Sequence, residues 1–421
     1  MRRPRALSSV RDERGMILPL TLMVVVILSS LVAVLLALAG MEPQIAANLH
    51  GGTEALFAAD SGVEYAFGLM RAANAPVVGF NGFLGATYNG AVGQGRSYSV
   101  QILDNADDNP ANPASDSDDT VIIDSTGTAP GGATRRIRAI VTGRYIFDDA
   151  VATNDDLLVT GSSCVLGNRG GVHSNRNLTV SGSSVTIDQQ ATASGTFAVN
   201  GHPTIGGLTG GGYPSHPIAD LQPASFRSLA TIVLKANGTA TDGAGNPIPG
   251  PPEWSFNPGG GGQWSCCSGR DGTNGTLFVE TDVHISSSPN SPTNPWRLTL
   301  ITTGNLQITG NPSIAPALDP ATGKPLDLQF LAGKDITMGG FPSECTNCLA
   351  GLIYAREQFE INGNVPLRGV LMALDAADSP GSPVRAGRNR LTGSTCVILN
   401  GNLRLRGVNG PLRFLSWRIM P

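Results

Sequence analysis

Residues 14–40 read RGMILPLTLMVVVILSSLVAVLLALAG, a charged residue and a glycine followed by a long apolar run. From Met16 to Ala39 this run has 24 residues and no Asp, Glu, Lys, Arg or His. As an α-helix, which rises about 1.5 Å per residue, it would be roughly 36 Å long. The hydrocarbon core of a bilayer is about 30 Å thick. The run therefore predicts a membrane-spanning helix.

The charges beside this run predict its orientation. Five arginines precede it against Asp12 and Glu13, and Glu42 is the first charged residue after it. Because positively charged flanks stay in the cytoplasm, we expect residues 1–15 to form a cytoplasmic leader. The protein would cross the inner membrane once, with its C-terminal part periplasmic or extracellular. A removed signal peptide is the alternative, although its apolar core is usually only about 7 to 15 residues long.

An amphipathic segment continues the helix. Apolar residues recur at mostly helical spacing up to about Ala73, and Pro43 and the pair Gly51-Gly52 interrupt them. Such residues cause kinks or local loosening. We therefore expect one interrupted helix over residues 16–73.

A small β module is expected to follow over residues 74–150. Three segments in it alternate or run apolar as strands do, namely 97–102, 120–123 and 136–141. Packed on the C-terminal half of the helix, these strands would complete an α+β unit.

This order of basic leader, glycine, apolar helix and amphipathic helix resembles type IV pilins, and most closely the PilX-type minor pilin N-terminal region. The resemblance covers roughly residues 11–73 and includes the sequence ALFAADSGVEYA at residues 55–66. It implies that a prepilin peptidase cleaves between Gly15 and Met16. Major pilins carry a glutamate at the fifth mature position, where this chain has Leu20. That glutamate is associated with docking in the fibre, so Leu20 departs from the pattern of ordinary shaft subunits.

The resemblance also implies a function that is not enzymatic. The protein would be a minor pilin-like structural subunit of a type IV pilus or pseudopilus. The size of its β domain together with Leu20 predicts a position at the tip or as a priming subunit. It would display a large β domain for assembly or adhesion. Its partners would be other pilins, the pilus assembly machinery, the prepilin peptidase and the membrane.

Residues 151–421 predict a large, Gly-rich, all-β domain. The 421-residue chain is 41% hydrophobic and only 14% charged, and its 54 Gly and 29 Pro favour short strands and turns. From about Asp155 an apolar-x-apolar segment followed by glycine recurs, with glycines at 161, 182 and 201. This spacing is typical of a β-solenoid, in which each coil buries alternate side chains. A β-sandwich is the alternative.

The repeated pattern returns later in the chain, at residues 306–310, 336–339, 359–363 and 397–401. Val180 and Ile361 are expected to point into the core, and Thr179 and Glu360 away from it. The repeats are similar to the bactofilin type of β-solenoid, a resemblance of pattern that carries no catalytic residues. The Gly- and Pro-rich residues 206–275 predict a loop insertion with one helix around 223–235. Residues 412–419 predict a closing strand.

Six cysteines lie beyond the apolar run, at positions 164, 266, 267, 345, 348 and 396. Disulfides persist in the oxidising compartment expected there. Cys345-Thr-Asn-Cys348 has the spacing of half a zinc site or a redox motif, but Cys266-Cys267 cannot supply the other half. We expect disulfides among Cys266, Cys267, Cys345 and Cys348, with the pairing left open. Free buried thiols and a metal site are the alternatives.

An acidic stretch of the β module offers oxygen ligands suited to calcium: Asp104, Asp107, Asp108, Asp116 and Asp118. The stretch does not match an EF-hand loop, so a solvated acidic loop is the alternative. We predict no other metal and no other cofactor.

The sequence contains few signals of catalysis. Its five histidines are scattered, and no Gly-x-Ser-x-Gly elbow or phosphate-binding loop occurs. A net charge of −4 gives no basic face for nucleic acid. Two alternatives to a pilin remain: a membrane-anchored β-helical adhesin or scaffold, and a polysaccharide-acting enzyme. The enzyme would use a groove with Asp375, Asp378, Arg385, Arg388 and Arg390.

Overall fold

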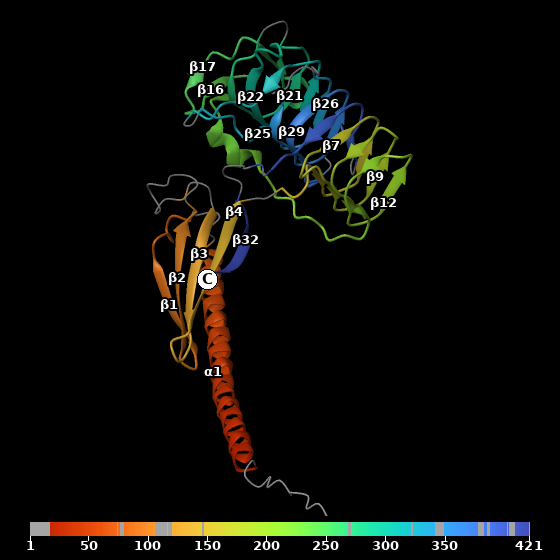
Figure 1. Ribbon diagram of the computed structural model, residues 1–421. Coiled ribbons are helices and arrows are strands. Elements are labelled where there is room, and N and C mark those ends of the chain that lie inside the picture. The colour runs from red at the N-terminus through yellow and green to blue at the C-terminus, as the bar shows by residue number, and fades with distance from the viewer. Residues whose placement is uncertain are drawn as a thin grey trace, which may run out of the picture. The chain divides into compact units, whose positions relative to one another are not determined.

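The computed structural model describes residues 17–73, 75, 80–105, 116, 120–144, 147–267, 271–320, 323–341, 349–377, 383–384, 388–401, 403 and 409–420. The chain forms two compact units: unit 1 comprises Met1–Gly143 and Leu412–Pro421, and unit 2 comprises Arg144–Pro411 (Figure 1). Unit 2 is therefore an insertion in the sequence of unit 1. The sequence analysis assigned all residues after 150 to the second domain, and this was wrong for the C-terminal segment.

The helix of unit 1, α1, runs from Ile17 to Ala72 and contains Pro43. Every described side chain from Ile17 to His50 is exposed, and burial begins at Gly51. Neither Pro43 nor the glycine pair breaks the helix, which is continuous from Ile17 to Ala72. Instead, the glycine pair marks the change from a free half of α1 to a docked half.

A five-stranded sheet, counted over the described residues, covers the docked half of α1. Its order is β1-β2-β3-β4-β32, and β1 to β4 pair antiparallel in sequence. The predicted strands at 97–102, 120–123 and 136–141 are confirmed within this sheet. Its strands are β1 Thr87–Gly93, β2 Arg96–Asp104, β3 Thr120–Thr128, β4 Thr134–Arg144 and β32 Asn409–Met420.

The C-terminal strand β32 belongs to this sheet. The sequence analysis expected it to close the second domain, which it does not. Leu412 packs against the core of unit 1. The Phe414 ring stacks on the Phe67 ring of α1, with centroids 4.5 Å apart. The strand was correctly predicted, but a short amphipathic strand carries no signal for which of two sheets it joins.

Small residues let α1 lie directly on the sheet. Its buried side is formed by Gly51, Gly52, Ala55, Ala58, Ala59, Gly62, Val63, Ala66 and Met70. A Cβ atom added to Gly127 of β3 would collide with the backbone of Ala55 and Ala59. The buried Ser125 hydroxyl donates a 2.7 Å hydrogen bond to the Ala59 carbonyl oxygen. Helix and sheet are thus joined at backbone distance.

The strands of unit 2 form two sheets of ten and seventeen strands over the described residues. The ten-stranded sheet contains, in spatial order, β12 Phe197–Asn200, β9 Leu178–Ser181, β6 Leu157–Thr160, β30 Asn389–Leu391, β28 Phe359–Asn362, β26 Ile336–Gly339, β23 Leu306–Thr309, β21 Asp282–Ile285, β19 Gln263–Cys266 and β18 Trp254–Asn257. The seventeen-stranded sheet contains β5 Val151–Thr153, β7 Cys164–Leu166, β8 Val172–Ser174, β10 Thr186–Ile187, β11 Ala191–Ala193, β13 Thr204–Ile205, β14 Thr209–Gly210, β15 Ile232–Leu234, β16 Ala240–Asp242, β17 Pro247–Ile248, β20 Gly275–Val279, β22 Trp296–Thr302, β24 Ile314–Ala315, β25 Leu328–Ala332, β27 Ala350–Ala355, β29 Pro366–Ala373 and β31 Cys396–Ile398. Two 3₁₀ helices are η2 Pro223–Leu229 and η3 Gly259–Gly261.

We call each repeat of short strands along the chain of unit 2 a coil. The strands of neighbouring coils pair mostly in parallel and in register. Leu157, Leu178 and Phe197 lie side by side on β6, β9 and β12. Gly161 and Gly182, at the corners after β6 and β9, have φ angles of 79° and 122°, which favour glycine. Val180 and Ile361 are buried and Thr179 and Glu360 are partly exposed, so these predicted facings are confirmed.

The order of the coils along the stack differs from their order in the sequence. The chain enters at β5 to β7, proceeds to β12 to β14, and resumes at β15, which pairs with β20. It then returns coil by coil until β31 pairs with β7 and β29 pairs with β5. We call the junction of β29 and β31 with β5 and β7 the seam.

The sequence analysis expected residues 206–275 to form one loop insertion. The structure shows several strands there instead. These residues contain β15 to β19, and the segment expected as a helix at 223–235 contains η2 and β15 instead. Although glycine and proline weaken helix and strand propensity, parallel pairing of β15 with β20 and β19 with β21 supplies the backbone hydrogen bonds.

Gly127→Ala tests the close approach of α1 to the sheet. The added methyl group would push the helix backbone away, and we expect a loss of about 1 to 3 kcal/mol in the free energy of unfolding. Gly68→Ala on α1 is the matched control, because its added Cβ meets nothing within 4 Å. Chemical denaturation of both variants in detergent measures the difference. Equal stability of the two variants would show that the helix does not lie on Gly127.

Candidate functional site

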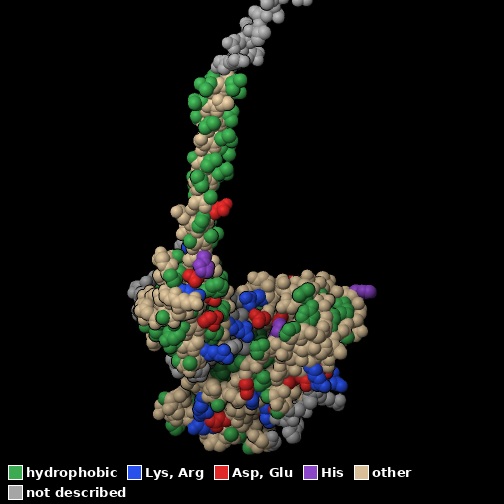
Figure 2. Space-filling model, turned by 90° about the horizontal axis from the view of Figure 1, so that it is seen from below, with side chains coloured by type: hydrophobic (Ala, Val, Ile, Leu, Met, Phe, Trp, Pro, Cys, Tyr) green, Lys and Arg blue, Asp and Glu red, His purple; other side chains and the backbone are tan. Residues whose placement is uncertain are grey.

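The largest exposed apolar surface of the described chain is the free half of α1. An 18-residue window has a mean hydropathy of 3.0 and none of it is buried. Leu18 is 77% exposed and Leu36 is 69% exposed, and apolar side chains surround this half of the helix (Figure 2). By length and composition α1 can cross a membrane. A helix that is apolar all round requires lipid or protein around it.

Leu20, at the position where the pilin pattern has glutamate, lies on this free half and is 64% exposed. The described part of the free half contains Glu42 as its first acidic residue. The expected processing residues Gly15 and Met16 lie outside the described residues, so the cleavage site stays a prediction.

On the helix-free face of the sheet, a buried carboxylate fastens β3 to β4. Asp124 accepts hydrogen bonds from Arg136 and Arg138, and its Oδ2 lies 2.6 Å from Arg138 Nη2. Burial raises the pKa of Asp124, but the hydrogen bonds and charges of the two arginines outweigh burial and lower it. The carboxylate therefore stays ionised and stabilises the sheet that carries α1.

Unit 2 contains a cluster that sequence spacing did not reveal. The rings of His173 and His216 stack with centroids 3.8 Å apart. His216 Nδ1 lies 2.7 Å from the buried Asp149 Oδ2. Asn175 donates from Nδ2 to the His216 carbonyl and accepts at Oδ1 from the His216 amide. The histidines are 43 positions apart in the sequence. They meet because the segment after β14, which contains His216, packs against β8, which contains His173.

The His173 ring is buried and stays neutral near neutral pH. Its Nδ1 lies 2.8 Å from Thr192 Oγ1 and its Nε2 lies 3.0 Å from Asn175 Oδ1. Burial lowers the pKa of His173, and the neighbouring His216 lowers it further against the opposing effect of Asp149. The cluster fastens residue 216 to the first coils. No group of three or more His, Cys, Asp or Glu that could hold a metal ion is found among the residues with described positions.

Of the predicted calcium ligands, Asp104 and Asp116 are described and both are buried. Asp116 Oδ1 accepts the Thr120 amide at 3.2 Å, which starts β3. Asp107, Asp108 and Asp118 lie outside the described residues. Calcium binding therefore stays a prediction on the sequence alone.

The described part of unit 2 contains two disulfides. Cys164 and Cys396, which are register partners on β7 and β31, are bonded across the seam, 232 residues apart in sequence. Cys266 is bonded to its neighbour Cys267. The sequence analysis named Cys266 and Cys267 as candidates but foresaw neither pairing. Cys345 and Cys348 lie outside the described residues.

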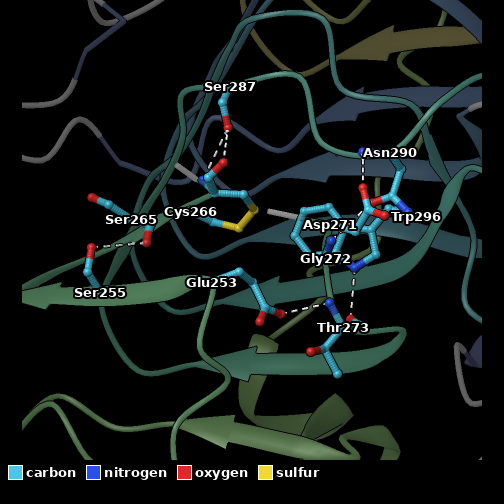
Figure 3. Close-up of a disulfide and its surroundings, with 11 residues drawn as sticks. Glu253, Ser255, Ser265, Cys266, Asp271, Gly272, Thr273, Ser287, Asn290 and Trp296 are labelled. Carbon is cyan, nitrogen blue, oxygen red and sulfur yellow. Dashed lines mark hydrogen bonds between the residues drawn. A yellow bond between two sulfur atoms is a disulfide. The ribbon is translucent and has the colours of Figure 1, made fainter. Parts of the chain in front are cut away.

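The Cys266–Cys267 disulfide lies where β19 ends (Figure 3). The Ser287 hydroxyl donates a 2.5 Å hydrogen bond to the Cys267 carbonyl oxygen. Nearby, Trp296 is fully buried and its Nε1 donates to the Thr273 carbonyl at 2.8 Å. The hydrogen bond from Ser287 thus joins the disulfide to the segment that follows β21.

Of the residues expected to line a polysaccharide groove, Asp375, Arg388 and Arg390 are described. Asp375 accepts one hydrogen bond from Asn389 Nδ2 on β30 and another, across the seam, from the Asp155 amide. Burial raises the pKa of Asp375 to about 6. Arg390 faces Glu360 at 4.0 Å, and Arg388 is exposed. Asp378 and Arg385 lie outside the described residues. Asp375 is accounted for as a tie between coils.

Comparison with known proteins leaves the chain without an assigned family. No protein family model matches the chain, and no curated protein matches it in sequence. The crystal structure of the competence-associated pilin ComZ from Thermus thermophilus is similar over 88% of this chain and 97% of that chain. The identity is 12% and the TM-score is 0.28, a level at which the likeness carries no argument about function.

The lowered pKa of His173 predicts a pH dependence of stability. In the unfolded chain histidine has its ordinary pKa of about 6.5, so protonation favours unfolding as the pH falls below that value. The contribution of His173 is complete above about pH 6.5 and is lost below it. We expect His173→Gln to flatten the decline in melting temperature between about pH 7 and 5, and the exposed His202→Gln to leave it unchanged. Identical slopes for wild type and His173→Gln would contradict the prediction.

Proposed function

We propose that this protein is a pilin-like structural subunit anchored in the inner membrane by the free half of α1. The observation that carries the proposal is the division of one continuous helix into two halves. Residues 17–50 are exposed and largely apolar, and the remainder is docked on an antiparallel sheet by small residues. The free half suits lipid before assembly and the helices of other pilins in a fibre.

We propose that unit 2 is a β-solenoid that serves assembly or adhesion. The support for this proposal is the parallel, in-register pairing of successive coils and the burial of alternate side chains within them. Such an elongated scaffold presents extended surfaces for assembly or adhesion.

We further propose a minor subunit at the tip or in a priming complex of a type IV pilus or pseudopilus. A shaft subunit repeats at short intervals, and an inserted domain as large as residues 144–411 would crowd its neighbours. Leu20 supports the same placement, because it provides no carboxylate to pair with the N-terminal amine of an adjacent subunit. Leucine at this position also avoids the cost of a carboxylate in the bilayer.

Processing by a prepilin peptidase between Gly15 and Met16 is part of this proposal. Gly15→Leu replaces the small residue at the proposed cleavage site and should leave the full-length chain in the membrane. Intact mass and N-terminal sequencing measure the outcome, with Gly40→Leu as the control that is processed normally. A wild-type chain that begins at Met1 or beyond Ala39 would overturn the pilin-like function.

Fibre composition tests the placement separately. We expect quantitative mass spectrometry of sheared fibres to find this chain far below the copy number of the major pilin. Comparable copy numbers would refute a tip or priming position. Complete absence from fibres, together with recovery in the membrane, would instead favour an anchored adhesin or scaffold.

A further inference from the structure

The two ends of the stack in unit 2 differ in how they finish. At one end the strands turn back as antiparallel hairpins, β15 with β16 and β18 with β19. Trp254 and Trp264 are buried there. At the other end the last coil consists of β12, β13 and β14, as Figure 1 shows for β12. Within the described chain these three strands pair only with β9, β10 and β11 of the preceding coil. We call this the open end.

The open end leaves the interior of the stack uncovered. Val199 is the register partner of Val180, which is fully buried, yet Val199 is 44% exposed. Ile205 is the partner of the fully buried Ile187 and is itself only partly buried. Leu208, just before β14, is 67% exposed. Val199 and Ile205 occupy positions that are buried in the preceding coil, and Leu208 lies beside them. A further coil stacked on this end would cover all three side chains.

The open end also lacks the usual protection of an exposed strand edge. Proteins commonly protect such edges with charged side chains, because unpaired backbone groups otherwise recruit another strand. Residues 189–219 contain no Asp, Glu, Lys or Arg. Two such ends can therefore approach each other without charge repulsion, and pairing would bury both apolar interiors.

We propose that the open end is an interface for a second copy of this chain, joined end to end about a two-fold axis. A partner must present a coil of matching outline with unpaired strands, and the open end of another copy meets this requirement. The hairpin-capped end does not offer such strands, so the contact is head to head. A head-to-head contact closes at two copies and does not continue into a filament. The inference is independent of incorporation into a pilus.

Sedimentation of the full-length chain in detergent micelles over a range of concentrations tests the interface. The probe variants are Val199→Lys and Leu208→Glu, and the control is Leu318→Lys, whose parent side chain is 42% exposed elsewhere in unit 2. Any association through α1 is common to all four proteins. We expect a wild-type dimer whose dissociation constant rises by at least about tenfold in both probe variants, since each places a charge in the apolar contact.

The control should associate as the wild type does. If the wild type stays monomeric up to a protein concentration of about 100 µM, any self-association is too weak to be a specific interface, and the proposal is overturned. Equal association in all four proteins also overturns it, because the contact would then lie on another surface. If Val199→Lys fails to fold, Leu208→Glu decides, since its parent side chain is already mostly exposed. Amide exchange gives a second readout: strands β12 to β14 should lose protection on dilution, and unchanged exchange contradicts the interface.

Discussion

The pairing of β32 with the sheet that carries α1 constrains the whole chain. Because the last strand returns to unit 1, all of unit 2 must begin and end close together. The seam meets this requirement, since the first strands β5 and β7 pair directly with β29 and β31. A stack built in simple sequence order would place its two ends at opposite extremes. The reordered coils therefore follow from the need to insert one unit within another.

The polar groups of unit 2 concentrate where segments distant in sequence meet. The Cys164–Cys396 disulfide and the hydrogen bond from the Asp155 amide to Asp375 both cross the seam. The cluster of Asp149, His173 and His216 fastens the chain that leaves the last coil. A parallel seam cannot rely on a tight turn to hold its strands in register. The disulfide and these hydrogen bonds supply that restraint, which gives these residues a structural role.

In unit 1 the same restraint comes from close packing. The stripe of Gly and Ala on α1 meets Gly127, and Ser125 donates to a helix carbonyl. The small residues leave little apolar volume at this contact, so its geometry depends on backbone proximity. The contact fixes the docked half of α1 on the sheet and leaves residues 17–50 free of it.

The sequence by itself determined the features that depend on neighbouring residues. Hydropathy determined the apolar helix, and alternation determined the strands of unit 1 and the inward facing of Val180 and Ile361. Only the tertiary structure decided that β32 joins unit 1, that Cys164 meets Cys396, and that His173 stacks on His216. The tertiary structure also decided the strands within residues 206–275, because the glycines and prolines there give no sequence pattern that predicts their strand pairing. Local patterns report what a residue prefers to face, whereas partners more than 40 positions apart depend on the order in which the coils stack.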